Sequence, residues 1–306
     1  GQLEAILGKH DAFKTQHGFC ADGVCNMTHL GFNMSDFVNG VAKKHGQVSR
    51  EMFDGYSIDS ITNGIHVATF ACPPIRDLFD KYIPNWRDDN FSLRYAMGIP
   101  HHELWEAHLN AKQQLLAFVK NRTGVELDQS LLTIGFARRA TPYKRADLIF
   151  SDMERLKEIV SNGGKFQLIY AGKAHPKDEE GKNIIRRVVA AKKELQDYIP
   201  IVYLENYDLE IGKLITSGVD IWLNTPQPPL EASGTSGMKA AINGVPSFSV
   251  LDGWWIEGWI EGITGWAISA DPSARIPGHG TAFEAASFYN KLDQVIAPMF
   301  LSLIHI

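Results

Sequence analysis

Residues 131–137 read LLTIGFA, an almost continuous apolar run. A strand covered on both faces of a parallel sheet shows this pattern, whereas a strand with one solvated face alternates apolar and polar residues. Four similar runs follow: FQLIYA at 166–171, PIVYL at 200–204, DIWLN at 220–224 and SFSVL at 247–251. Helical spacing of apolar residues at 146–161, and a helix-like stretch at 184–198, separate the first three runs. This alternation predicts an α/β fold with a doubly wound parallel sheet.

The composition is that of an ordinary globular protein. Hydrophobic residues make up 44% and charged residues 21% of the 306 residues, which excludes a disordered or collagen-like chain. The 30 Lys and Arg against 35 Asp and Glu give a formal net charge of −5, which does not favour nucleic-acid binding. No apolar run approaches the ~18 residues of a membrane-spanning helix. The mean hydropathy is −0.15.

Three cysteines, Cys20, Cys25 and Cys72, are too few for a disulfide framework. Four residues separate Cys20 from Cys25, but no second Cys or His pair completes a zinc site. Reduced cysteines are typical of the cytosol, and residues 1–13 lack the basic start and apolar centre of a signal peptide. We therefore expect a cytoplasmic protein without a metal site.

The first 130 residues are less regular than the rest. Residues 35–53 and 100–121 fit helices, and the SITNG segment at 60–64 is a candidate seam. At roughly 150 residues per domain, the length suggests about two domains. We expect a partial first domain at 1–61 and a doubly wound domain at 62–306.

The loop after the first apolar run is strongly basic. It reads RRATPYKR and places four cations, Arg138, Arg139, Lys144 and Arg145, within eight residues. Ligands of doubly wound sheets bind at the carboxyl ends of the strands, where this loop lies. Arg and Lys there favour phosphate oxygens through charge-assisted hydrogen bonds. A solvated basic loop without a ligand is the alternative, and the residues alone leave both interpretations open.

The segment 225–244 after the fourth run reads TPQPPLEASGTSGMKAAING. Its small residues at 232–237 let the backbone approach a ligand closely and direct N–H groups toward it. We expect Ser236 to cap a helix that begins near Gly237, with Lys239 in the first turn. The Walker pattern is absent. Lysine in this setting suits a pyridoxal phosphate Schiff base, and a tight helix entry with a surface lysine is the alternative.

Two further clusters carry weaker signals. The segment HHELWEAH at 101–108 suggests a metal site, but His102 and His108 do not share a helix face, which favours a helix surface. Four tryptophans gather in DGWWIEGWIEGITGW at 252–266 and indicate either packing or a platform for sugar rings: Trp254, Trp255, Trp259 and Trp266.

Together these segments resemble the glycogen/starch (α-glucan) phosphorylase family, pyridoxal-phosphate enzymes of the GT-B fold. EASGTSGMKAAING at 231–244 resembles the family's EASGTGNMK segment, and RRATPYKR resembles its KR-I-H-E-YKR segment. Three shorter blocks match in the same order: VNGVAKKH at 38–45, TNGI at 62–65 and ENY at 205–207. The likeness extends from about residue 27 to residue 300.

The resemblance implies a set of residues around pyridoxal 5′-phosphate. Lys239 resembles the Schiff-base lysine, and Arg138 stands where the family has a lysine near the cofactor phosphate. Tyr207 matches a cofactor neighbour, while Thr235 and Gly237 belong to the segment expected against the cofactor. Phosphorylases use the phosphate group of this cofactor rather than its ring as the reacting group.

The resemblance also implies α-1,4-glucan and inorganic phosphate as partners. Phosphorolysis of a terminal glucosyl residue then gives α-glucose 1-phosphate with retention of configuration. Arg139 and Lys144 match the residues that hold the substrate phosphate between the cofactor and the sugar. Four residues match positions that hydrogen-bond the glucosyl hydroxyls: Asn63, Glu231, Ser233 and Gly234.

The sequence departs from the family pattern in two places. Asp36 stands where the family often has a histidine that contacts the sugar, and WWIE at 254–257 replaces the GANVE stretch after LDG. Both departures are typical of a shorter bacterial or archaeal branch.

The chain begins without Met and ends in LSLIHI, which has no family counterpart. We therefore expect a fragment that covers the C-terminal part of a homodimeric phosphorylase, lacks much of the glucan-binding wall and is weakly active alone. A nucleotide-sugar-dependent glucan synthase of the same fold and an inactive cofactor-binding remnant are the alternatives. Retention of Arg139, Lys144 and Lys239 argues against the remnant.

Overall fold

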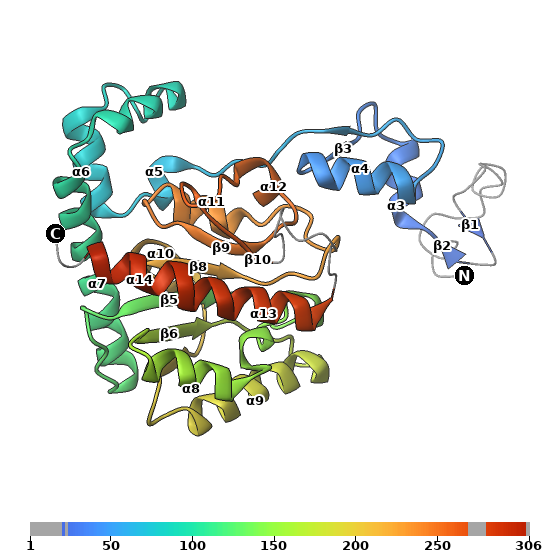
Figure 1. Cartoon of the computed structure of the whole chain (residues 1–306). Coiled ribbons are helices and arrows are strands. Elements are labelled where there is room, and N and C mark those ends of the chain that lie inside the picture. The colour runs from blue at the N-terminus through green and yellow to red at the C-terminus, as the bar shows by residue number, and fades with distance from the viewer. Residues whose placement is uncertain (1–19, 22–23, 269–279, 304–306) are drawn as a thin grey trace. The chain divides into compact units, whose positions relative to one another are not determined.

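The computed structural model describes residues 20–21, 24–268 and 280–303 (Figure 1). The chain divides into two compact units, Gly1–Thr62 and Asn63–Ile306, and this division lies within the SITNG segment. The side chains of Cys20 and Cys25, and residues 304–306 of the LSLIHI end, lie outside the described part. No helix among the described residues has the length and apolar character needed to cross a membrane.

Unit 1 contains short elements. Strands β1 (Cys20–Ala21) and β2 (Val24–Cys25) pair antiparallel, and β3 (Asn39–Gly40) pairs parallel with β4 (Asp59–Ser60). Its helices are α3 (Met27–Asn33) and α4 (Lys43–Met52). The helix expected at 35–53 is therefore wrong before residue 43. The segment before it is extended instead, because Asn39 and Gly40 pair with Asp59 and Ser60. The backbone of Gly40 approaches that of Gly46 so closely that a Cβ on Gly40 would lie 2.5 Å from the Gly46 nitrogen, so this position requires glycine.

Unit 2 is built on a six-stranded parallel sheet with the order β10-β9-β8-β5-β6-β7. All five predicted runs form strands. Their bounds are β5 (Leu132–Ala137), β6 (Phe166–Ala171), β7 (Ile201–Leu204), β8 (Ile221–Asn224) and β9 (Ser247–Val250). The sixth strand, β10 (Gly265–Ile268), was not predicted, because its four residues lie at the end of the tryptophan-rich segment.

Helices cover both faces of this sheet, as the near-continuous apolar runs predicted (Figure 1). One face packs against α8 (Met153–Ser161), α9 (Glu179–Glu194) and α13 (Thr281–Lys291). The other packs against α7 (His101–Thr123), α10 (Leu209–Gly218) and α11 (Thr235–Ala241). Alternate residues of β8 enter the two cores: Ile221 and Leu223 join the first and Trp222 the second.

Helix boundaries differ from the predictions where an aspartate caps the helix. The helix expected at 146–161 begins at Met153, because the Asp152 carboxylate accepts the Arg155 N–H at 2.9 Å. A short 3₁₀ turn, η3 (Leu148–Phe150), precedes it. Likewise, α9 begins at Glu179 behind Asp178 and ends before the expected residue 198. The helix expected at 100–121 is confirmed as α7.

The remaining elements extend the two cores. Helices α5 (Val67–Phe70) and α6 (Pro73–Tyr82), with the 3₁₀ helix η1 (Asn90–Gly98), pack on α7 through a third apolar cluster. The loops carry η2 (Pro142–Lys144) and α12 (Trp255–Gly258). A π-helical segment, η4 (Leu292–Ile296), joins α13 to α14 (Ala297–Leu303). Of the four clustered tryptophans, Trp255 and Trp266 are buried, whereas Trp254 and Trp259 are half-buried.

A buried charge network ties α7 to the start of β8. Lys112 donates to Asp220 Oδ2 at 2.6 Å and to the Leu131 carbonyl at 2.7 Å. His108 Nε2 lies 2.7 Å from Asp220 Oδ1, and the Thr133 N–H donates to Asp220 Oδ2 at 2.7 Å. The expectation that His108 belongs to a helix surface is therefore wrong, because the His108 side chain is buried against the Asp220 carboxylate. Among the described residues, no group of His, Cys, Asp and Glu has the arrangement of a metal site.

Replacing Asp220 with Ala should lower the free energy of unfolding by about 3–5 kcal/mol, because the fully buried Lys112 loses its counter-charge. Urea denaturation followed by circular dichroism measures the change. The control is Glu126→Ala, which removes the exposed partner of Lys120 and should cost less than about 1 kcal/mol. Equal losses in the two variants would contradict a stabilising role for the network.

Candidate functional site

The strand order creates a switch point between β5 and β8. From β5 the chain continues to β6 and β7 on one side, then returns to β8, β9 and β10 on the other. The loops that follow β5 and β8 therefore diverge and leave a crevice at the carboxyl edge of the sheet, where such folds bind ligands. The basic loop 138–145 follows β5, and the small-residue segment 225–234 follows β8.

Three predicted site residues meet at this crevice, and we call Arg138, Lys144 and Glu231 the ion cluster. Nη2 of Arg138 donates to both carboxylate oxygens of Glu231, at 3.0 and 2.9 Å. Nζ of Lys144 donates to Glu231 Oε2. The side chains are 10%, 4% and 7% exposed, respectively, so water screens their charges little. One carboxylate thus holds two cations from the opposite loop.

Neighbouring residues that the sequence analysis did not assign to the site hold the ion cluster in place. Arg138 Nη1 donates to Asn224 Oδ1 at 2.6 Å and to Ser236 Oγ at 3.3 Å. The Glu231 N–H donates to Asp252 Oδ2 at 2.9 Å. Asn224 ends the predicted run DIWLN at the ligand-binding edge, so its position was a usable signal. Asp252 directly follows the predicted run SFSVL, so it carried the same positional signal at the same edge of the sheet.

Arg145 has a different role from the other cations of the basic loop. Its Nε donates to the Thr225 carbonyl at 2.9 Å and its Nη2 to the Pro226 carbonyl at 2.6 Å. Its Nη1 donates to the buried Glu284 on α13. Arg145 therefore fastens the basic loop to the segment after β8 and to α13, and its donors are used within the protein.

Arg139 is exposed beside the ion cluster. Its charge helps to lower the pKa of Lys144. For Tyr143, which lies between the two residues in the sequence, burial and the charge of Glu231 raise the pKa, and the charge of Arg139 opposes that rise. Burial is the largest influence on Lys144 and lowers its pKa to about 8, with Arg138 adding to the effect and Glu231 opposing it. Lys144 is therefore a cation that loses its proton in the mildly alkaline range.

The segment before Lys239 folds differently from the prediction. Helix α11 begins at Thr235, and Gly234 occupies the N-cap position with a left-handed backbone (φ +90°). Ser236 therefore lies within the helix rather than capping it, and Lys239 falls in the last turn rather than the first. The helix begins two residues earlier than predicted because Gly234, rather than Ser236, occupies the N-cap position.

The Lys239 amine lies over an aromatic ring. Nζ is 4.4 Å from the centre of the Phe70 ring, and no pattern in the sequence singled out Phe70. Burial, followed by the charge of Arg138, lowers the pKa of Lys239. The Asn243 side-chain amide donates to the Lys239 carbonyl at 2.8 Å and to the Phe70 carbonyl at 2.9 Å. Asn243 thus joins the two segments that position the amine.

The remaining predicted site residues lie at different depths. Tyr207 is half-buried after β7, and burial raises its pKa while Arg138 lowers it. Thr235 is half-buried at the start of α11, and Gly237 is buried on the same helix. Ser233 is buried, and its hydroxyl has no hydrogen-bond partner among the described residues. Asn63 is exposed in the segment before α5 and does not join the ion cluster.

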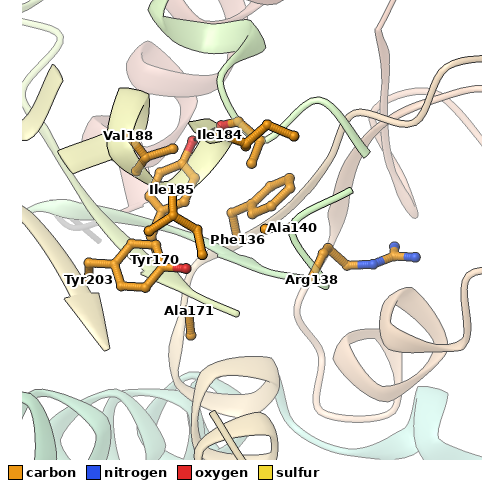
Figure 2. Close-up of a pocket in the computed structure, with 10 residues that line it drawn as sticks. Phe136, Arg138, Ala140, Tyr170, Ala171, Ile184, Ile185, Val188 and Tyr203 are labelled. Atoms are coloured by element: carbon orange, nitrogen blue, oxygen red, sulfur yellow. Dashed lines mark hydrogen bonds between the residues drawn. The ribbon is translucent and has the colours of Figure 1, made fainter. Parts of the chain in front are cut away.

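Cavities of very different size flank the sheet. A small apolar cavity of about 10 Å³ lies against β5, β6 and α9, and Arg138 extends away from the apolar side chains that line it (Figure 2). A cavity of about 770 Å³ lies at the opposite, amino edge of the sheet, with Trp105, His108 and Asp220 in its wall. The larger cavity contains none of the predicted site residues. The gathered cations and the strand order favour the carboxyl edge as the site.

Comparisons with known proteins agree on one family. A family model described as carbohydrate phosphorylase matches residues 13–261. The chain is 41% identical to maltodextrin phosphorylase from Thermococcus litoralis and 40% identical to glycogen phosphorylase from Aquifex aeolicus. Each alignment covers 90% of this chain, but only 36% and 43% of the respective relative. Glycogen phosphorylase from Mycobacterium tuberculosis is 36% identical, with 35% of its length covered. The chain thus spans less than half of these relatives.

Sulfate affinity should fall as the pH rises through about 8, by up to about tenfold, because Lys144 then loses its charge. Sulfate keeps the same charge over this range, so the change reports on the protein, and isothermal titration calorimetry measures it. In Lys144→Arg the fall near pH 8 should disappear, since arginine stays protonated. Identical pH profiles for the two proteins would exclude Lys144 from the anion site.

Proposed function

The chain belongs to the carbohydrate phosphorylase family, and we propose that it carries the cofactor- and phosphate-binding part of an α-glucan phosphorylase. The proposed reaction moves a terminal glucosyl residue of an α-1,4-glucan to inorganic phosphate. The bond from the anomeric carbon to the glycosidic oxygen breaks, and a bond from that carbon to a phosphate oxygen forms. The glycosidic oxygen takes a proton, and the products are α-glucose 1-phosphate and a glucan shorter by one residue.

The gathering of cations at the switch point is the observation that carries this proposal. Four cations gather here, Arg138, Arg139, Lys144 and Lys239, against the two carboxylates of Glu231 and Asp252. Two phosphate groups in contact repel each other, so a site that holds both needs several cations. The donor set therefore fits a cofactor phosphate next to a substrate phosphate.

Pyridoxal 5′-phosphate would supply a phosphate group with a second pKa near ~6, suited to proton exchange with inorganic phosphate at neutral pH. The residues present fit this group. The lowered pKa of Lys239 increases the fraction of neutral amine, the form that reacts with a carbonyl group. Arg138 would face the cofactor phosphate, with Thr235, Gly237 and Tyr207 around the cofactor.

On the substrate side, we assign the reacting phosphate to Arg139 and Lys144. Lys144 is already held in the crevice by Glu231, and Arg139 is exposed beside it. Glu231, Gly234, Ser233 and Asn63 would then bind the glucosyl hydroxyls. Because the Ser233 hydroxyl is buried, we assign its sugar contact to the backbone N–H. Phosphate on the face from which the glucan departs would account for retention of configuration.

We extend the proposal to the architecture of the whole protein. Unit 2 corresponds to the cofactor-binding domain of a GT-B enzyme, and residues 1–61 correspond to part of its glucan-binding domain. The parallel sheet with the order β10-β9-β8-β5-β6-β7 supports the first assignment. The short paired strands and helices of unit 1 carry no such pattern, so the second assignment relies on the family relationship.

Borohydride reduction of the pyridoxal-phosphate-saturated protein should fix the cofactor covalently on the peptide that contains Lys239. Peptide mass spectrometry detects the adduct. The matched control is Lys239→Arg, which keeps a cation on α11 but lacks the reactive amine, and should yield no adduct. An unmodified Lys239 peptide from the saturated protein would contradict the proposal and favour a nucleotide-sugar-dependent synthase.

Replacing Arg139 with Ala should lower phosphorolysis by about 10²–10³-fold while the cofactor stays bound, because the variant loses stabilisation of charge in the transition state. Kinetics of glucose 1-phosphate release, with varied phosphate, measure the effect in the protein that carries this chain. Arg122→Ala at the end of α7 is the control, since Arg122 is also exposed but lies outside the site. Unchanged kinetics in Arg139→Ala would exclude the role.

A further inference from the structure

A small polar cavity separates the sheet from the start of α11. Its volume is about 10 Å³. Side chains from the sheet line it on one side: Trp222, Asn224, Ser247 and Ser249. Residues of the segment leading into α11 and of the segment after β9 line it on the others: Ser233, Gly234, Gly237, Asp252, Trp254 and Trp255. Such a volume matches one water molecule and excludes a larger ligand.

The sheet explains why polar groups collect here. Trp222 and Asn224 are two positions apart on β8, so both face the same side, and they pair in register with Ser247 and Ser249 on β9. Gly237 lets α11 approach this face, because a Cβ on Gly237 would lie 3.3 Å from the Ser247 hydroxyl. The polar face of two adjacent strands is thereby covered by a helix that supplies few side-chain partners.

Three buried polar groups in this lining have no hydrogen-bond partner among the described residues. They are Nε1 of Trp222, Oγ of Ser233 and Nε1 of Trp255. The residues are 0%, 7% and 3% exposed. An unpaired buried donor loses its bond to solvent without a replacement, so native proteins rarely leave such groups unsatisfied. All three residues line the same small cavity.

The geometry points to a bound water molecule at this site, shared by Trp222, Ser233 and Trp255. Each indole N–H can only donate, so the occupant must offer lone pairs to both. A cation is excluded because it would face two N–H donors. Water accepts from the two indoles and donates to the Ser233 hydroxyl, within the two to four bonds typical of buried water.

This water would lie next to residues that hold the ion cluster. Asn224 lines the same cavity and accepts a hydrogen bond from Arg138 at 2.6 Å. Ser233 and Gly234 connect the cavity to Glu231, which holds Arg138 and Lys144. The inference stands independently of the proposed reaction, because it rests on burial and unpaired groups alone.

Water-selective NMR on the full chain with ¹⁵N-labelled tryptophan tests the site. The indole N–H signals of Trp222 and Trp255 are assigned with Trp222→Phe and Trp255→Phe. Both signals should show cross-relaxation with water of the sign given by a long-resident molecule. Trp86 is the internal control, because this buried indole donates to Asp80 Oδ1 at 2.8 Å and should show no such transfer.

A matched pair of glycine variants tests the cavity itself. Gly237→Ala adds a methyl group at the cavity and should abolish the water signal on Trp222, whereas Gly98→Ala adds one where nothing lies within 4 Å and should preserve it. A folded wild-type protein without water transfer at either indole overturns the proposal, as does a signal that persists in Gly237→Ala. If Gly237→Ala fails to fold, the proposal is judged on the wild-type protein, by comparing water transfer at the Trp222 and Trp255 indoles with that at Trp86.

Discussion

The carboxylate of Glu231 is the contact on which the arrangement of the site depends. It accepts hydrogen bonds from Arg138 and Lys144 and so joins the loop after β5 to the segment after β8. A buried ion pair gains little stability over well-packed apolar residues, but loss of one partner leaves costly uncompensated charge. What the ion cluster does is to keep two cations ordered side by side at the carboxyl edge of the sheet.

Strand β8 connects this cluster to a second buried ionic group. Asn224 at its carboxyl end holds Arg138, and Asp220 just before its amino end holds Lys112 and His108. Only three residues, 221–223, separate Asp220 from Asn224. The strand is buried along its whole length, so it fixes the position of α7 on one edge relative to the candidate site on the other. The polar cavity beside Trp222 lies on the same strand.

Local patterns predicted the elements whose signal lies within one segment. The five apolar runs became strands, and α7 appeared where helical spacing placed it. Errors occurred where a distant contact competed with the local pattern. Gly40 packs against Gly46 and forms a strand within a predicted helix, and Gly234 starts α11 before the predicted cap at Ser236. His108 is buried rather than on the helix surface because Asp220, far along the chain, provides a buried hydrogen-bond partner.

The sequence by itself determined the class of fold, the edge of the sheet that carries the candidate site and the kinds of residue gathered there. Apolar periodicity is a local property, and parallel strands always direct their carboxyl ends to one edge. Only the tertiary structure decided which cation pairs with which carboxylate. Arg138 meets Glu231 across 93 positions, while Arg145 in the same loop meets Glu284 across 139. Strand order and helix packing set which of these partners comes within reach of each cation. An ion pair forms only where its nitrogen and oxygen atoms come within about 4 Å of each other, and spacing along the chain carries no record of that proximity.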